Sequence, residues 1–288
     1  MKVGLQIPSF TYPGDAPLSD QLAEIVKTAD QSGFDTIAVM DHFWQITNVG
    51  PPEEPMLEAY TTLGWIAAQT TRARLLTLVT GVIYRQPGLL AKIITTLDVL
   101  SGGRAWLGIG AAWNEDESKG LGFPFPPLAE RFEILEEALQ ICLQMWAGDE
   151  KPYTGRHFTL DRPLNSPQPI TRPHPPIMIG GGGEKKTLRL VAQYGDACNL
   201  FPAAPDELRR KLDVLRGHCE AVGRNYDDIQ KTIYYIYDTS HGTQKIVDDL
   251  GGYSELGFSL AIGQVKGVSG LTPLEQIGHD VIPVVQLI

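Results

Sequence analysis

Apolar runs that predict strands alternate with amphipathic segments that predict helices along the whole chain. The predicted strands are short and almost continuously apolar, as at residues 34–40, which is typical of parallel strands buried on both faces. The predicted helices repeat their apolar residues about every three or four positions, and the helix at 18–32 is terminated by Gly33. This pattern predicts a parallel sheet covered by helices.

The alternation predicts eight strand–helix repeats. Strands are expected at residues 3–7, 34–40, 74–82, 104–111, 176–180, 196–201, 231–237 and 258–263. Helices are expected at residues 18–32, 57–69, 87–100, 132–146, 181–195, 205–222, 243–250 and 273–279. Eight repeats in 288 residues favour a single (β/α)8 TIM barrel of the α/β class over two doubly wound domains. We therefore predict one domain spanning residues 1–288.

Residues 148–176 interrupt the alternation. The segment contains a predicted hairpin at 153–161 and six prolines from Pro163 to Pro176, and we interpret it as an insertion before the fifth strand. Because loops carry specificity, we expect the insertion and the loops at 44–57 and 264–272 to shape the substrate site.

Composition and charge restrict the classes of partner. The net charge of −10 and the lack of a basic stripe argue against nucleic-acid binding. Three cysteines without metal or CxxC spacing are typical of a reducing compartment. No signal-peptide pattern is present, and no apolar run reaches the roughly 20 residues of a membrane span. We expect a cytoplasmic protein that acts on a small molecule, without a membrane partner.

Polar and glycine-rich residues follow four consecutive predicted strands. In a (β/α)8 barrel the active site lies at the carboxyl ends of the strands. These positions are Asp41-His42 after strand two, Thr80-Gly81 after strand three, Ala111 to Asp116 after strand four, and Gly180 to Gly183 after strand five. The barrel interpretation therefore predicts that all four groups lie on one face.

Asp41 and His42 are the strongest catalytic candidates. A neutral imidazole is the commonest group for moving a proton near neutral pH. The alternative is structural, with Asp41 accepting backbone N–H groups and His42 packing on Trp44. We favour the functional interpretation because polar residues at barrel strand ends are usually catalytic.

The remaining candidates concern binding. Gly180, Gly181, Gly182 and Gly183 precede a helix and are expected to form an anion site, since backbone N–H groups can approach a phosphate closely there. Asn114 offers both a donor and an acceptor, whereas Glu115, Asp116 and Glu117 are expected to face solvent. Trp44, Trp113 and Phe201 could line an apolar substrate site or belong to the core. No metal site is expected, because the ligand spacing is poor.

Four segments resemble the bacterial luciferase-like superfamily, and specifically its branch of coenzyme F420-dependent oxidoreductases. They are "GFDTIAVMDHF", "LVTGVIYRQPGLLAKIITTLDVLSGGRAWLGIGAAWNEDE", "ERFEILEEALQICLQMW" and "PPIMIGGGGEKKTLRLVAQYGDACNLF". The resemblance spans almost the full length, and the block ending at Trp113-Asn114-Glu115 is its most specific part. The family fold is a (β/α)8 barrel, and the family implies a homodimer.

The resemblance also implies roles for single residues. Asp41 is expected to bind the deazaflavin and His42 to stand beside its reactive ring carbon. Thr80 and Gly81 match a bulge behind the ring, often near a non-prolyl cis peptide. Further contacts are implied for Ala111, Ala112 and Asn114 (ring and ribityl chain) and for Gly181 and Gly182 (phosphate).

One departure from the family affects the expected substrate. Sugar-phosphate dehydrogenases of this branch carry a catalytic carboxylate after strand four, where this chain has Ala111-Ala112-Trp113. We therefore expect hydride transfer between F420 and an apolar enone, imine or quinone-like substrate, with His42 moving the proton and Asp41 holding the ring. Two alternatives stay open, an FMN-dependent monooxygenase of the same superfamily and a non-catalytic cofactor-binding protein; a metal-dependent hydrolase is a distant third.

Overall fold

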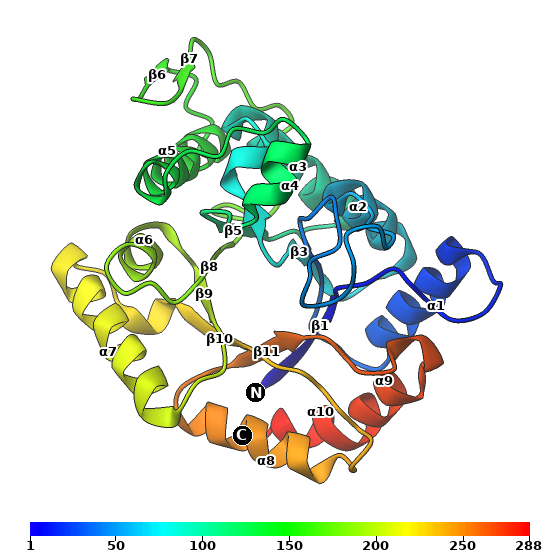
Figure 1. The fold of residues 1–288 in the computed structure, drawn as a ribbon. Coiled ribbons are helices and arrows are strands. Elements are labelled where there is room, and N and C mark those ends of the chain that lie inside the picture. Colours follow the sequence, from blue (N-terminus) through cyan, green and yellow to red (C-terminus); the bar gives the residue numbers. More distant parts are fainter.

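The protein, described over residues 1–288 by a computed structural model, forms a parallel barrel surrounded by helices (Figure 1). One sheet contains nine strands in the order β3-β2-β1-β11-β10-β9-β8-β5-β4. They are β1 (Lys2–Ile7), β2 (Thr36–Val39), β3 (Arg74–Thr77), β4 (Thr80–Gly81), β5 (Leu107–Gly110), β8 (Ile177–Gly180), β9 (Ala197–Leu200), β10 (Gln230–Tyr234) and β11 (Leu260–Gly263). A parallel bridge between Leu75 and Ala105 closes the barrel, which confirms the predicted fold.

The helices lie outside this sheet. They are α1 (Leu18–Gln31), α2 (Ala59–Gln69), α3 (Pro87–Ser101), α4 (Glu115–Gly120), α5 (Leu128–Trp146), α6 (Thr187–Tyr194), α7 (Pro205–Val222), α8 (Gln244–Glu255), α9 (Thr272–Gln276) and α10 (Ile282–Val285). Short 3₁₀ turns occur at Val82–Tyr84, Tyr226–Asp228 and Val268–Gly270, and a π turn at Ile277–Val281 joins α9 to α10. The sequence predicted α1 to α3 and α5 to α9, with ends shifted by up to six residues, but it did not predict α4, α10 or the three 3₁₀ turns.

The predicted third strand is split in two. Strands β3 and β4 flank Leu78 and Val79, which are joined by a cis peptide bond, as the family resemblance implied. Beside this break, a Cβ added to Gly108 of β5 would lie 1.9 Å from the carbonyl oxygen of Thr77. Only glycine allows the two backbones to approach so closely.

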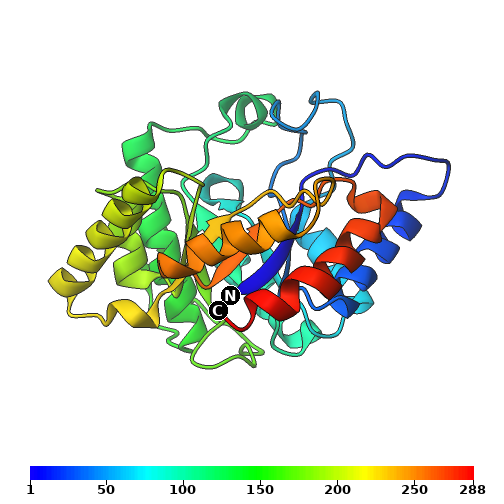
Figure 2. The ribbon, with the colours of Figure 1, turned by 90° about the horizontal axis from the view of Figure 1, so that it is seen from below.

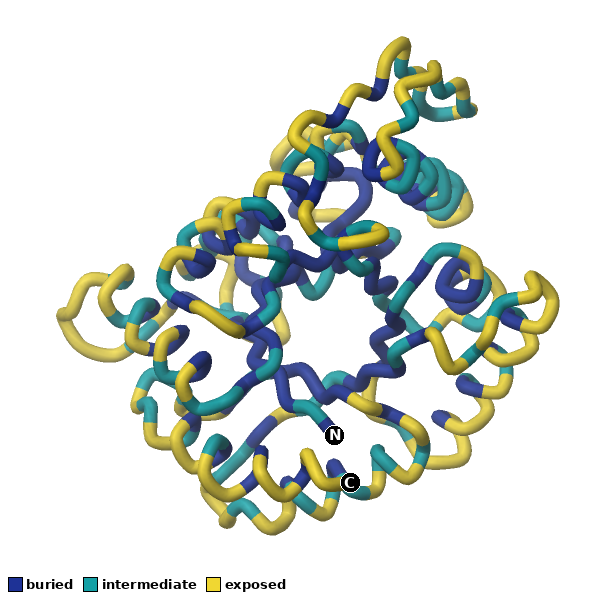
Figure 3. The backbone as a smooth tube through the Cα atoms, turned by 180° about the vertical axis from the view of Figure 1, so that it is seen from behind, coloured by how far each residue is buried: buried dark blue, intermediate teal, exposed yellow.

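The wall of the barrel separates two hydrophobic clusters. The larger cluster lies between the strands and the helices, where the apolar faces of the helices pack. The smaller one lies inside the barrel and consists of Ala38, Leu76, Trp106, Met178, Ala197, Leu260 and Ile262. Figure 3 shows the buried strands as a continuous inner ring with exposed positions on the outer turns of the helices.

The insertion at 148–176 lies outside the barrel. Its hairpin, β6 (Tyr153–Thr154) and β7 (Thr159–Leu160), packs on the outer side of α5, where the Tyr153 hydroxyl donates to Gln140 (2.8 Å). Its proline-rich part is held by Asp98, near the C-terminal end of α3, which accepts the backbone N–H of Ile170 (2.8 Å). Helices of a (β/α)8 barrel run antiparallel to the strands, so this end lies opposite the catalytic face (Figure 2). The proline-rich part of the insertion therefore lies away from the strand ends. Leu160 of the hairpin lies beside Gly88, at the opposite end of α3, so a role of the insertion in shaping the substrate site stays a prediction.

Candidate active site

His42 follows β2 and contacts a buried carboxylate. Its Nδ1 lies 2.8 Å from Oε2 of Glu117, which is 0% exposed, while the His42 side chain is 12% exposed. Oε1 of Glu117 accepts the backbone N–H groups of Phe43 and Trp44, and Oε2 also accepts the hydroxyl of Tyr84 (2.8 Å). The arrangement joins the loop after β2, the turn after β4 and helix α4.

Glu117 reaches this position because α4 begins at Asn114. The Asn114 side chain accepts the N–H of Glu117 (3.4 Å) and so caps the helix. One face of this short helix, Glu117 and Ser118, is buried, while Glu115 and Asp116 are exposed. The expectation of solvent exposure is therefore confirmed for Glu115 and Asp116 and wrong for Glu117, and the predicted loop contains a helix.

The environment of Glu117 favours its ionised form. Burial alone would raise the pKa of this carboxyl. The hydrogen bond with His42 and the backbone N–H groups of Trp44 and Phe43 outweigh burial and lower the pKa below its ordinary value. Glu117 is therefore a carboxylate near neutral pH and can only accept hydrogen bonds.

Asp41 points into the protein and pairs with an arginine. Both of its oxygens accept from Arg85, at 2.7 and 2.9 Å, and the Arg85 guanidinium also donates to Glu58 (2.6 Å). The guanidinium lies over the ring of Tyr60, 4.6 Å from its centroid. Burial raises the pKa of Asp41, and the two hydrogen bonds from Arg85 oppose that shift. Direct contact between Asp41 and a ring stays a prediction; in this structure both oxygens are engaged by Arg85.

Thr80 and Gly81 form β4, but the side chain of Thr80 lies inside the wall. Its hydroxyl is hydrogen-bonded to those of Tyr60 (2.6 Å) and Thr77 (2.7 Å), and it is 0% exposed. Val79, just before it, is partly exposed and lies beside two other strand ends. A Cβ added to Gly110 or Gly180 would lie 3.1 or 2.9 Å from the Val79 side chain. Val79 is therefore the side chain of this bulge that faces the strand ends.

Ala111 and Ala112 follow β5 and are partly exposed. Ala112 adopts φ = 62°, a left-handed conformation that is uncommon without glycine, and its carbonyl accepts from Nη1 of Arg131 (3.1 Å). Arg131 lies on α5 and stacks over Phe125, 4.0 Å from the ring centroid. This support from α5 holds the loop in the conformation that leads into Trp113.

Gly180 ends β8, and Gly181 to Gly183 form the turn that follows it. Gly181 has φ = 113°, and helix α6 begins at Thr187, four residues beyond the last of these glycines. The ammonium of Lys211, on α7, donates to the carbonyl of Gly182 (3.0 Å). The turn thus combines glycine backbone with a cation, which suits a phosphate.

The three predicted aromatic residues occupy different environments. Trp113 is 59% exposed and lies edge-on to His42, with ring centroids 5.3 Å apart. Phe201, after β9, is 66% exposed and lies 5.8 Å from Tyr234 at the end of β10. Trp44 instead packs against Gly120 of α4, where an added Cβ would lie 2.1 Å from the indole. Trp113 and Phe201 are thus available at the barrel mouth, and Trp44 has a packing contact.

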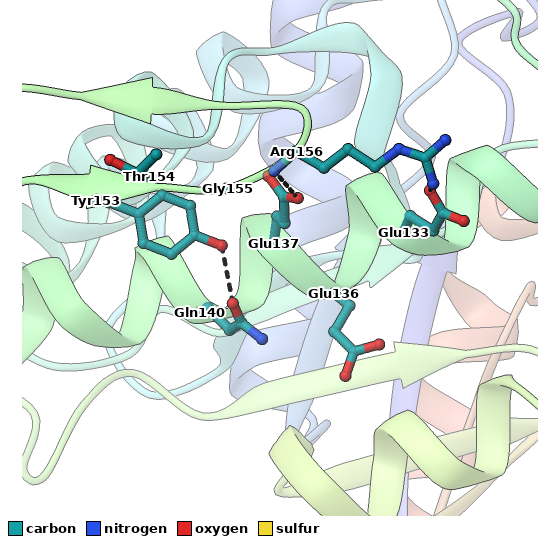
Figure 4. A pocket seen from close by; sticks show the side chains of 8 residues that line it. All are labelled: Glu133, Glu136, Glu137, Gln140, Tyr153, Thr154, Gly155 and Arg156. Atoms are coloured by element: carbon teal, nitrogen blue, oxygen red, sulfur yellow. Dashed lines mark hydrogen bonds and ion pairs between the residues drawn. The ribbon is translucent and has the colours of Figure 1, made fainter.

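The groove shown in Figure 4 is a different site. It lies between α5 and the hairpin and is lined by Glu133, Glu136, Glu137, Gln140, Tyr153, Thr154, Gly155 and Arg156. Its carboxylates already have partners, including Arg156 for Glu133 (2.7 Å) and Arg189 for Glu136 (2.6 Å).

No helix of the protein is both long and apolar enough to cross a membrane.

Three residues of the site were missed by sequence reasoning. Glu117 had a usable signal, since Asn followed three residues later by Glu is typical of a helix start. Lys211 belongs to the basic run Arg209-Arg210-Lys211 of α7, which by itself is typical of a solvated helix face. Arg85 had no local signal, because its partner Asp41 is 44 residues away.

Comparison with known proteins identifies the family. The profile of the luciferase-like monooxygenase family matches residues 1–253. A curated relative from Kineococcus radiotolerans, named F420-dependent glucose-6-phosphate dehydrogenase, is 31% identical over 224 residues, which cover 74% of this chain and 62% of that protein. The match thus spans less than two thirds of that relative.

Two solved structures share the fold. An F420-dependent secondary alcohol dehydrogenase in complex with an F420–acetone adduct has a TM-score of 0.83 at 18% identity, over 99% of both chains. An EDTA monooxygenase from Chelativorans sp. BNC1 has a TM-score of 0.82 at 13% identity, over 100% of this chain and 94% of the other. At these identities the likeness concerns the fold. The family match over residues 1–253, together with this barrel, means that the chain belongs to the luciferase-like monooxygenase family.

Proposed function

We propose that this protein is an F420-dependent oxidoreductase that transfers a hydride between the deazaflavin and a small, apolar organic substrate. The observation that carries the proposal is His42, held by Glu117 at the carboxyl end of β2 beside the exposed ring of Trp113. The name of the K. radiotolerans relative and that of the alcohol dehydrogenase structure support F420 as the cofactor.

The residues at the barrel mouth fit a flat ring with a phosphate-bearing tail. Val79 offers an apolar surface next to Gly110 and Gly180, neither of which has a side chain to obstruct a ring. The turn at 181–183 offers backbone N–H groups, with Lys211 as a nearby cation. In this proposal Val79 packs behind the ring, and the glycine turn holds the phosphate.

The chain's own contribution is orientation and proton transfer. The deazaflavin, when bound, supplies or accepts the hydride. In the reducing direction a protonated His42 donates its proton to the substrate as the hydride arrives, so the substrate gains one hydride and one proton. In the oxidising direction neutral His42 accepts the proton that the substrate loses.

An apolar substrate is supported by the side chains around His42. Trp113 and Phe201 expose aromatic surface, and the stretch Ala111-Ala112-Trp113 stands where the family resemblance implies a carboxylate in the sugar-phosphate dehydrogenases. We therefore propose enones, imines or quinone-like compounds as the substrate class. The expected homodimer and cytoplasmic location stay predictions.

An FMN-dependent monooxygenase is the second candidate. The observation in its favour is the TM-score of 0.82 with the EDTA monooxygenase, almost equal to that with the alcohol dehydrogenase. A flat apolar wall and a phosphate turn suit FMN as well as F420. The presence of an acid–base residue beside the ring position favours hydride transfer.

Reduced F420 carrying deuterium at its reactive ring carbon tests the proposed function. We expect the protein to consume it in the presence of cyclic enones, imines or quinones under anaerobic conditions, with deuterium appearing on carbon in the product. If the organic substrate were consumed only with oxygen and reduced FMN, and no deuterium were transferred from F420, the protein would be assigned to the monooxygenases instead.

A further inference from the structure

We propose that Glu117 is a positioning residue that keeps neutral His42 in the Nδ1–H tautomer and reserves Nε2 for proton exchange with the substrate. The role in turnover rests on the proposed function, whereas the tautomer itself is a property of the protein alone. The proposal is carried by the hydrogen bonds of Glu117 and by the surroundings of the two imidazole nitrogens.

The partners of Glu117 determine which nitrogen carries the proton. Oε1 accepts two backbone N–H groups, those of Phe43 and Trp44. Oε2 accepts the Tyr84 hydroxyl and lies 2.8 Å from His42 Nδ1. An ionised carboxylate has no hydrogen to give, so Nδ1 can satisfy this contact only as the donor. Neutral His42 must therefore carry its single ring proton on Nδ1.

The other nitrogen is left available. Nε2 of His42 has no hydrogen-bond partner in the protein, and it is not among the buried polar atoms that lack one. The neighbouring indole of Trp113, with its ring centroid 5.3 Å from that of the imidazole, is inclined by 70° and has no acceptor for a ring N–H. A neutral His42 thus presents a lone pair, and a protonated His42 presents an N–H, at the single nitrogen that is free.

This arrangement defines what each group does in a turnover. In reduction, the N–H bond at Nε2 breaks as the proton passes to the substrate, and His42 is left neutral with its Nδ1–H donated to Glu117. In oxidation the lone pair at Nε2 takes the substrate proton. Glu117 stays ionised in both directions, as expected for a buried carboxylate that orients an imidazole.

The Glu117→Gln variant should invert the tautomer. The glutamine carbonyl is expected to take the Oε1 position, because two backbone N–H groups require an acceptor there. The amide NH₂ then faces Nδ1 of His42 and donates to it, so the ring proton moves to Nε2. Side-chain volume is almost unchanged, and neutral His42 loses its free lone pair.

Long-range ¹H–¹⁵N correlation spectra of ¹⁵N-histidine-labelled protein, recorded without cofactor, test this inference. His42 is assigned by the signals that disappear in His42→Asn. We expect Nδ1–H in the wild type, Nε2–H in Glu117→Gln, and Nδ1–H again in Tyr84→Phe, which removes a donor to Glu117 but keeps the carboxylate. Wild-type protein with the proton on Nε2 would overturn the proposal, even if Glu117→Gln did not fold.

Turnover provides the second readout. With reduced F420 and an accepted substrate, Glu117→Gln should lower kcat by about 10²-fold or more while KM changes by less than about threefold. The decrease in kcat caused by Tyr84→Phe should be much smaller. An unchanged kcat in a Glu117→Gln protein whose tautomer is inverted would overturn the functional role. If the wild type bound no F420, the proposed function would fail while the tautomer result would stand.

Discussion

Replacing Arg85 by alanine is expected to lower the free energy of unfolding by about 3–5 kcal/mol. The reason is Asp41, which is 2% exposed and receives hydrogen bonds from Arg85 on both oxygens. Without Arg85 the carboxylate is buried and uncompensated, and the loss should be measured by chemical denaturation monitored by circular dichroism.

The loss of stability caused by Arg85→Ala should become smaller as the pH is lowered. Burial raises the pKa of Asp41, and removing Arg85 takes away the main opposing interaction, so the pKa rises further. A carboxyl whose pKa is higher in the folded than in the unfolded state binds its proton more tightly when folded. Lowering the pH from about 8 to about 5 should therefore reduce the stability deficit of the variant.

An exposed ion pair provides the matched control. Arg162 pairs with Glu150 at 2.7 Å, with the two side chains 67% and 44% exposed, so Arg162→Ala should cost less than about 1 kcal/mol. Adding Asp41→Asn to Arg85→Ala should recover part of the loss, since the buried group is then neutral. Equal unfolding curves for Arg85→Ala and Arg162→Ala would contradict the buried-pair account.

Replacing His42 by alanine is expected to lower kcat for hydride transfer by about 10²–10⁴-fold. Of His42, Asp41 and Glu117, only His42 has a polar side-chain atom without a partner in the protein, because Asp41 is engaged by Arg85 and Glu117 is enclosed. Its loss removes proton transfer but leaves Val79 and the glycine turn in place. The affinity for F420 should therefore change much less than kcat.

The effect of His42→Ala on kcat should be compared with the effect of replacing a histidine outside the site. His279 has a side chain that is 89% exposed and contacts Asp280, in the π turn before α10. We expect His279→Ala to turn over at the wild-type rate. Wild-type turnover by His42→Ala, measured with saturating reduced F420, would remove His42 from the mechanism.

The barrel and the place of its site could be predicted because both follow from local patterns. Apolar strands and amphipathic helices alternate visibly, and the strand ends then locate His42, Thr80, Asn114 and the glycine turn on one face. The family resemblance implied the cofactor and the bulge at Thr80 and Gly81. The sequence alone was sufficient for both the fold and the resemblance.

Helix α4 and the buried charges could not be predicted in the same way. The sequence "NEDESKG" is polar and short, so it is typical of a loop; the helix depends on the Asn114 cap and on tertiary contacts of Glu117. His42 and Glu117 are 75 residues apart. Pairings at such distances leave no periodicity in a single sequence, and for this reason Glu117 and Arg85 were missed.

The proposed function requires that the barrel mouth bind F420 in preference to FMN. The most direct measurement is a fluorescence titration of the purified protein with oxidised F420 and, separately, with FMN. We expect saturable, tight binding of F420 and weak binding of FMN. We also expect loss of F420 affinity in Gly182→Asp, which places a carboxylate in the phosphate turn. Tighter binding of FMN, or F420 binding that Gly182→Asp leaves unchanged, would contradict the proposed function.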